Sequence, residues 1–229
     1  MDPNAKDQLG LAPLHRASAV LPLYFLDFET YMVAIPLYDG TSPYQQVPYQ
    51  YSLHYLEHEG AKLGHHEFLA EPNVDPREEV ARRLTEEIPA NACVLAFNAA
   101  FEIARLNELA RAFPRYRDKL ENIISNTIDL AIPFKRRQLY HWEMEGSYSQ
   151  KVVLPLMVPE LTYDGMEVGD GMMAMDAYFA MCGAKDPEEI ARTRSNLLEY
   201  CKLDTLGMVR ILDRLREIAK QGGSIKGKE

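Results

Sequence analysis

The sequence of 229 residues lacks features that would mark a membrane or secreted protein. No apolar run approaches the roughly 20 residues of a membrane-spanning helix, and the N-terminus has no apolar segment typical of a signal peptide. Only three cysteines occur, Cys93, Cys182 and Cys201, and they are widely spaced among apolar residues. That spacing argues against a zinc-type pairing and predicts reduced, buried thiols. We therefore expect a cytoplasmic protein with no membrane partner.

Basic residues are also in deficit. The chain has 25 lysines and arginines against 34 aspartates and glutamates, a formal net charge of −9. A protein that coats duplex DNA needs a broad positive surface to neutralise phosphates, so this composition argues against that class. It does not exclude an enzyme that holds a few nucleotides in an acidic cleft, because bound cations would neutralise part of the negative charge.

What is present is a succession of strands followed by helices, which predicts a single α/β domain over residues 21–220, with an arm at 1–20 and a tail at 221–229. Strands are predicted at 22–29, 49–57, 65–69, 92–97 and within 122–134. Helices are predicted at 75–88, 99–113, 172–181 and from Asp186 to about Lys220, the last as two helices, with a short helix near Lys151. The first three strands would form an antiparallel meander. The predicted fold is a mixed sheet flanked by helices.

Two carboxylates lie two positions apart in the apolar run 24–30, whose letters are YFLDFET. Side chains alternate along a strand, so Asp27 and Glu29 would project from the same face. Neighbouring carboxylates repel each other at the edge of a core, and a divalent cation between them would remove that conflict. The alternative is a strand end with two solvated acids.

A second acidic patch lies in AFNAAFE, residues 96–102, where a strand leads into a helix. Asn98 is predicted to cap that helix, and Glu102 follows one turn later, near the strand ends where ligands gather in α/β sheets. Taken alone, Glu102 is better interpreted as a first-turn acid that the helix dipole stabilises. Asp129 is a reserve candidate and is interpreted first as a structural acid at a strand end.

The third patch is YCKLD, residues 200–204, on the C-terminal helical segment. Tyr200 and Asp204 are four residues apart, so both side chains would point at the same spot. Apolar neighbours such as Leu197 and Val209 would place Asp204 beside the core. The alternative is a tyrosine packed over a helical turn beside an incidental surface acid.

The order of the three patches resembles the DEDD superfamily of 3′–5′ exonucleases. That order is D-x-E on the first strand, N-x-x-x-E at a strand–helix junction and Y-x-x-x-D on a late helix, over residues 22–215. The tyrosine places the likeness near the subclass whose third motif is Y-x-x-x-D. The resemblance implies a ribonuclease H-like fold and a two-ion site for Mg²⁺ or Mn²⁺. The second motif of the superfamily usually carries Asp, so Glu102 leaves slow activity or a preference for Mn²⁺ open.

Residues 146–171, GSYSQKVVLPLMVPELTYDGMEVGDG, also resemble an uncharacterised bacterial family of that superfamily, catalogued as a domain of unknown function. Its members carry a similar Gly-Ser-Tyr-Ser-x-Lys-x-Val-Leu-Pro stretch and a Phe-Glu in the second motif. They are often longer and have further domains, so this chain is either a minimal version or a fragment.

The resemblance assigns roles to the acids. Asp27 would bridge both ions. Glu29 and Asp204 would complete the ion that carries the attacking water, and Glu102 would hold the second ion through water. Tyr200 would orient the attacking water, because an unperturbed tyrosine pKa of about 10 makes it a poor general base.

Substrate contacts are predicted from weaker signals. The candidates are Thr30, Asn98, Arg137 and Lys151, with Gln50 and Ser52 added from a strand face that is expected to be exposed. Thr30 would meet the terminal 3′ hydroxyl by analogy with the superfamily. Arg137 belongs to a basic run beside aromatic residues, which suits phosphate contact and base stacking but equally suits a solvated charge run. Lys151 would reach a phosphate or lie on the surface.

The leading interpretation is a metal-dependent exonuclease that removes nucleotides from the 3′ ends of single-stranded DNA or RNA. The presence of all four acids and the tyrosine favours an active enzyme. One alternative is a weak or silent domain that binds nucleic acid or tethers a partner. Another is a phosphodiesterase of short oligonucleotides, which the acidic net charge favours.

Overall fold

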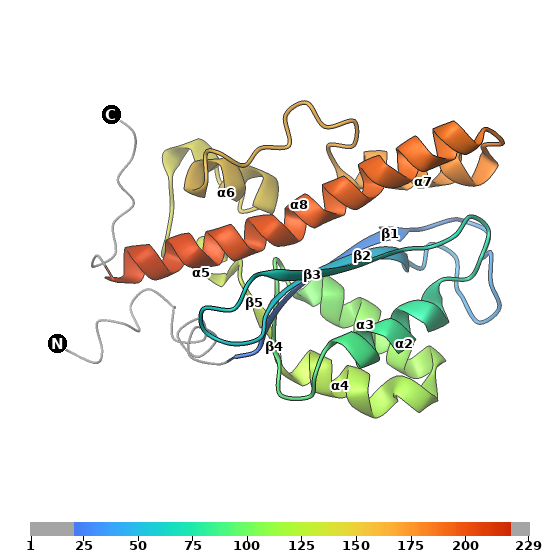
Figure 1. Ribbon diagram of the computed structural model, residues 1–229, viewed down its shortest axis with the longest axis horizontal. Coiled ribbons are helices and arrows are strands. Elements are labelled where there is room, and N and C mark those ends of the chain that lie inside the picture. The colour runs from blue at the N-terminus through green and yellow to red at the C-terminus, as the bar shows by residue number, and fades with distance from the viewer. Residues whose placement is uncertain (1–20, 221–229) are drawn as a thin grey trace.

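The computed structural model describes residues 21–220, and the predicted arm and tail lie outside the described residues. A five-stranded sheet has the order β3–β2–β1–β4–β5, with β1 at its centre (Figure 1). The strands are β1 (Leu23–Tyr31), β2 (Val47–Leu56), β3 (Gly64–Leu69), β4 (Cys93–Ala96) and β5 (Thr127–Asp129). β1, β2 and β3 pair antiparallel, whereas β4 runs parallel to β1 and β5 runs parallel to β4.

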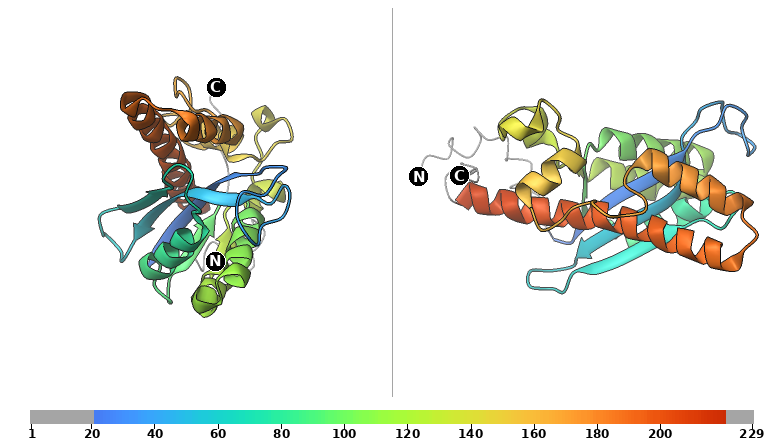
Figure 2. Two further views of the ribbon diagram at one scale, coloured as in Figure 1. Left: turned by 90° about the vertical axis from the view of Figure 1, so that its right-hand side faces the viewer. Right: turned by 90° about the horizontal axis from the view of Figure 1, so that it is seen from above.

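Helices cover both faces of this sheet. One face carries α2 (Arg77–Glu87), α3 (Ala100–Ala112) and α4 (Arg117–Ser125), and the other carries α6 (Gln150–Met157), α7 (Gly171–Gly183) and α8 (Pro187–Lys220) (Figure 2). Short segments complete the chain, namely α5 (Ile132–Lys135) and the 3-10 turns Pro114–Tyr116 and Trp142–Met144. The predicted mixed α/β sheet flanked by helices is confirmed, and its strand pattern is compatible with a ribonuclease H-like arrangement.

The prediction of two helices after Asp186 was wrong, because α8 is one helix of 34 residues. Buried residues recur along it every three or four positions, including Leu197, Cys201, Met208 and Leu212. That spacing keeps one continuous apolar face of the helix against the sheet, so a single helix can bury all of these residues without a break. None of the described helices is both long enough and apolar enough to cross a membrane.

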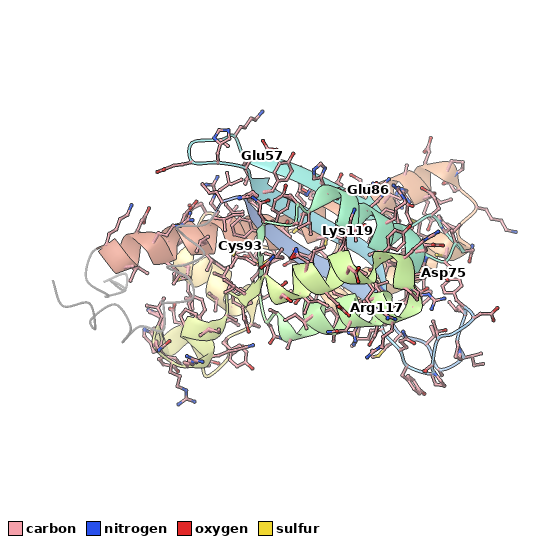
Figure 3. All side chains as sticks on the ribbon, turned by 90° about the horizontal axis from the view of Figure 1, so that it is seen from below. Glu57, Asp75, Glu86, Cys93, Arg117 and Lys119 are labelled. Atoms are coloured by element: carbon pink, nitrogen blue, oxygen red, sulfur yellow. The ribbon has the colours of Figure 1, made fainter. Side chains whose placement is uncertain are left out.

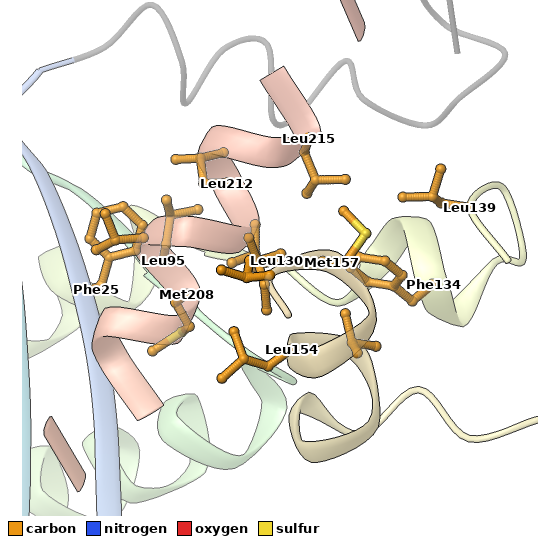
Figure 4. Packing of buried hydrophobic residues seen from close by; sticks show 14 of the residues in the cluster. Phe25, Leu95, Leu130, Phe134, Leu139, Leu154, Met157, Met208, Leu212 and Leu215 are labelled. Carbon is orange, nitrogen blue, oxygen red and sulfur yellow. The ribbon is translucent and has the colours of Figure 1, made fainter. Parts of the chain in front are cut away.

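Alternation along β1 separates the two cores. Leu26 and Phe28 belong to the cluster formed with α2, α3 and α4. Phe25 belongs to the opposite cluster, where Met208, Leu212 and Leu215 of α8 face Leu154 and Met157 of α6 (Figure 4). Because side chains two positions apart share a face, Asp27 and Glu29 project toward α7 and α8 rather than toward α3.

The layer of α2, α3 and α4 buries apolar residues on the sheet and directs charges outward. Figure 3 views this layer and labels Glu86, Arg117 and Lys119, all exposed. α2 begins after Asp75, whose carboxylate accepts the backbone N–H of Arg77. The predicted helix start at this residue is therefore confirmed, and the acidic candidates all lie away from this outer surface.

Gly207 allows α6 to approach the middle of α8. A Cβ at this position would lie 2.9 Å from Leu154 Cδ2 and 3.0 Å from Gln150 Nε2. Glycine inside a helix costs about 1 kcal/mol relative to alanine, so a reason for its presence is needed. The close packing of α6 supplies one.

We therefore expect Gly207→Val to lower the free energy of unfolding by about 1–3 kcal/mol, because the added side chain overpacks this contact. Urea unfolding followed by circular dichroism measures the change. The control is Gly183→Ala, since a Cβ at Gly183 would have no atom within 4 Å. Equal stability of Gly207→Val and the parent chain would show that the α6–α8 contact is not tight.

Candidate active site

A cleft of about 430 Å³ lies where β1, the end of β4, α6 and α8 meet. It is lined by Asp27, Glu29, Phe97, Asn98, Ser147, Tyr148, Ser149, Gln150, Lys151, Tyr200 and Asp204. Three of the four predicted acids, the predicted tyrosine, and both Asn98 and Lys151 thus line one cleft. They come from segments that are far apart in the sequence.

A larger cleft, of about 510 Å³, lies between the 40–48 loop and α3 but holds none of the predicted site residues. Two of its guanidinium groups are already paired, Arg77 with Asp75 and Arg105 with Glu108. The combination of carboxylates and a phenol makes the smaller cleft the better candidate for chemistry.

The acids of β1 form the tightest group in this site. Ligand atoms of Asp27, Glu29 and Cys201 all lie within 4.8 Å of one another. The Cys201 thiol lies 3.7 Å from Asp27 Oδ2 and donates toward it. Beyond Glu29 the pairing of β1 with β2 shifts register at Thr30, a bulge of the kind often found beside functional sites.

Asp204 reaches the same cleft from α8, four residues after Tyr200. Its Oδ1 accepts a hydrogen bond from Tyr163 Oη at 2.6 Å, and its backbone oxygen accepts one from Gln150 Nε2 at 2.7 Å. Lys151 Nζ lies 5.1 Å from the centroid of the Tyr200 ring and donates to the backbone oxygen of Gly169. The carboxylate is therefore held from several sides.

Glu102 lies in the first turn of α3 and is only 3% exposed. Its Oε2 is buried and has no hydrogen-bond partner within residues 21–220. Its charge is near enough to raise the pKa of both Asp27 and Glu29. A buried carboxylate oxygen without a partner is costly unless it is protonated or binds a cation.

Burial raises the pKa of all four acids. The pKa of Asp27 lies well above its usual value, with repulsion from Asp204 and then Glu29 adding to the effect of burial. Burial is also the first cause for Glu29 and Glu102, whose pKa values rise to about 8. For Asp204, burial raises the pKa to about 6, while the Tyr163 hydrogen bond, the charge of Lys151 and then a hydrogen bond from Tyr200 lower it. The site without cations therefore holds protons at neutral pH.

Asn98 lines the cleft, but its predicted capping role was wrong. Its backbone has a φ of 68°, in the left-handed region, and its side chain makes no capping bond. Instead Asn98 Oδ1 accepts from Lys135 Nζ at 2.6 Å, and its N–H donates to Asp129 Oδ1. Asp129 also pairs with Lys135 at 2.7 Å, which fits its interpretation as a structural acid.

The other predicted substrate-binding residues lie outside the cleft or are buried. Thr30 and Arg137 are not among the residues that line the cleft, and Arg137 is exposed. The expectation that Gln50 and Ser52 are exposed was wrong, because both are fully or almost fully buried. Gln50 Nε2 donates to the backbone oxygen of Leu197, and Ser52 Oγ bonds to Thr205, so both fasten α8 to β2.

Sequence reasoning missed several residues around the site, namely Tyr163, Gln150 and Cys201. Cys201 was predicted correctly as a buried thiol but not as a neighbour of Asp27. Tyr163 lies in the GSYS-containing segment that carried the family resemblance, which was the one available signal. No spacing rule links Tyr163 to Asp204 across 41 positions.

Comparison with known proteins gives a family but no activity. The chain is 26% identical over 205 residues to the "Uncharacterized protein MG366 homolog" of Mycoplasma pneumoniae. The aligned region covers 82% of this chain and 31% of that protein. It is 24% identical over 215 residues to the "Uncharacterized protein MG366" of Mycoplasma genitalium, covering 86% and 32%. The chain thus spans about a third of the length of these relatives. No solved structure matches it.

A family model described as "Domain of unknown function (DUF2779)" matches residues 24–149. This match includes the β1 acids, Glu102 and the start of the GSYSQK segment, and it covers more than half of the chain. The chain therefore belongs to the DUF2779 family.

Proposed function

We propose that this chain is a metal-dependent 3′–5′ exonuclease of single-stranded DNA or RNA, within the DEDD superfamily and its Y-x-x-x-D subclass. The observation that carries the proposal is the shared cleft of Asp27, Glu29, Tyr200 and Asp204, which come from β1 and α8. The order of their motifs is that of the superfamily. A divalent cation would stabilise the ionised form of carboxylates held together in such a cleft.

The donor set suits Mg²⁺ or Mn²⁺, because these ions favour carboxylate oxygens. Asp27, Glu29 and Asp204 face the cleft, whereas Glu102 does not line it but has a buried oxygen without a partner in the described part of the chain. Two bound ions would supply a water of lowered pKa and neutralise charge on the phosphodiester. The four raised carboxyl pKa values fit this role, since cations would displace protons from the same oxygens.

Tyr200 acts as a hydrogen-bond donor in this proposal. Burial first, and then the charge of Asp204, raise its pKa far above the usual value. The phenol therefore keeps its proton and can orient an attacking water, but it cannot abstract a proton from that water. This agrees with the role expected for the tyrosine of the third motif.

The wall opposite the acids suits a nucleotide. Tyr148 lines the cleft and is 43% exposed, so one ring face is available for a base to stack on. Lys135 Nζ lies 5.6 Å from that ring centroid, and Lys151 lines the cleft on the side of Tyr200. One lysine beside the Tyr148 ring and a second lysine in the cleft support recognition of a phosphate and its neighbouring base.

Single strands labelled at the 3′ or the 5′ end test the proposal. With Mn²⁺, we expect early release of the 3′ label as a mononucleotide and a descending ladder from the 5′ label, and no cleavage in EDTA. Asp204→Asn should be inactive. Its matched control on the same helix is Asp213→Asn, at a side chain that is 44% exposed.

Other results assign other functions. Internal cuts would contradict an exonuclease. Hydrolysis confined to oligomers of a few nucleotides would favour the short-oligonucleotide phosphodiesterase. A strand that is bound but left intact would favour a silent binding domain.

A further inference from the structure

A second tyrosine approaches the candidate metal ligands from outside the three motifs. Tyr163 lies in the connection between α6 and α7, and its Oη donates to Asp204 Oδ1 at 2.6 Å. Its ring centroid lies 6.1 Å from that of Tyr200. Two phenols therefore flank one carboxylate, although the superfamily motif accounts for only one of them.

Gln150 fixes the direction of this hydrogen bond. Its Nε2 lies 3.4 Å from Tyr163 Oη and 2.7 Å from the backbone oxygen of Asp204. Gln150 Nε2 can only donate, so the phenol oxygen accepts from it and the phenol proton remains for Asp204. The close approach at Gly207 brings Gln150 into this position.

Lys151 adds a second restraint. Its ammonium lies 5.7 Å from the centroid of the Tyr163 ring and 5.1 Å from that of Tyr200. A cation over an aromatic face is attractive, so Lys151 holds both rings in place. The carboxylate, the two phenols and the two α6 side chains form one connected group.

We propose that Tyr163 is a positioning residue that fixes the Asp204 carboxylate, so that Oδ2 is presented to a bound cation. This inference rests on the proposed function of the same site. Because Tyr163 restrains the carboxylate, Tyr200 is left to orient the attacking water. The connection between α6 and α7 thereby becomes part of the active site rather than a surface loop.

The separate roles of the two tyrosines predict different effects, one on Mn²⁺ affinity and the other on the rate of hydrolysis. Loss of an outer-shell hydrogen bond typically costs about 10–100-fold in metal affinity or activity. Tyr163→Phe should therefore raise the Mn²⁺ dissociation constant about 10-fold. Tyr200→Phe should leave that constant within about 2-fold and instead lower the rate of hydrolysis, since loss of correct orientation of a reacting group can cost about 100-fold.

Mn²⁺ binding to the full chain is measured by electron paramagnetic resonance, which needs no substrate. The matched control is Tyr178→Phe, whose hydroxyl makes a 3.5 Å contact with the backbone oxygen of Glu71 in another part of the molecule. Thermal unfolding without metal should be the same for Tyr163→Phe and the parent chain. Gln150→Met, which removes the amide and keeps the chain length, should weaken Mn²⁺ binding in the same direction.

Unchanged Mn²⁺ affinity in Tyr163→Phe would overturn this inference. If that variant did not fold, unchanged affinity in Gln150→Met would overturn it instead. The parent chain could bind Mn²⁺ more tightly than Tyr163→Phe and yet hydrolyse no single-stranded DNA or RNA. That result would refute the exonuclease and leave the role of Tyr163 intact. A parent chain that does not bind Mn²⁺ would refute both.

Discussion

Asp27→Asn is expected to lower the rate of 3′-end hydrolysis by about 1,000-fold or more, because removal of a central member of a catalytic group costs nearly the whole effect. The same change should raise the stability of the metal-free protein. Asp27 is half-buried beside Asp204 and Glu29, which repel its charge. A neutral amide avoids the cost of either protonating this carboxylate or holding its charge there. A gain of 1 kcal/mol would raise the Tm by about 2–4 °C in a domain of this size.

The two halves of this prediction are measured separately. Label release in Mn²⁺ gives the rate, and a thermal melt in EDTA gives the stability. Asp176→Asn is the matched control, since Asp176 is exposed on α7 and should change neither quantity. Loss of activity together with lower stability would mean that Asp27 stabilises the fold. It would contradict the idea that Asp27 lowers the stability of the metal-free protein and is present for function.

The metal-free protein should become less stable as the pH rises toward about 8. Glu29 and Glu102 have pKa values of about 8 in the folded chain, raised first by burial. In the unfolded chain the pKa of a glutamate is about 4.3. Between these values the folded state binds more protons, so the stability present below the unfolded pKa is lost as the pH passes through the folded pKa. The slope is about 1.4 kcal/mol per pH unit for each proton.

Two histidines, buried His54 and half-buried His65, act in the opposite direction, and they limit the useful pH range. Burial first lowers the pKa of His54 to about 3 and that of His65 to about 4. Because an unfolded histidine has a pKa of about 6.5, their contribution is present above that pH and is lost as the pH falls. Comparison of pH 7.5 with pH 8.5 therefore keeps the histidine contribution nearly constant and reports mainly on the carboxyl groups.

Urea unfolding in EDTA at the two pH values measures the effect, and added Mn²⁺ should reverse it. Cations bind the deprotonated acids of the folded state, so Mn²⁺ should stabilise the protein more at the higher pH. Glu102→Gln should flatten the pH dependence in EDTA. Equal stability at both pH values without metal would show that these acids are ionised in the absence of metal and need no cation.

The local parts of the fold and site were predictable. Alternation in YFLDFET placed Asp27 and Glu29 on one face, and the four-residue spacing placed Tyr200 with Asp204. Both are consequences of strand and helix geometry within a few residues. The Asp75-Pro76 helix start depends on similarly local chemistry.

Other parts depend on contacts between distant residues, which a single sequence does not reveal. α4 was missed because its two buried residues, Leu120 and Ile123, give too short a pattern beside its charged neighbours. Asn98 adopts a left-handed backbone because Asp129 and Lys135 hold it from β5 and α5. Tyr163 reaches Asp204 only because α6 packs on Gly207. Tertiary packing decides each of these features.

The unbroken length of α8 has a consequence for the chemistry. Its N-terminal half packs with α7 through Leu197, whereas its C-terminal half packs with α6 through Leu212 and Leu215. Asp204 lies between these two packed regions of the helix. Weaker packing of either half would tilt α8 and move the Asp204 carboxylate relative to β1. The rate of hydrolysis should therefore decline well before the molecule unfolds.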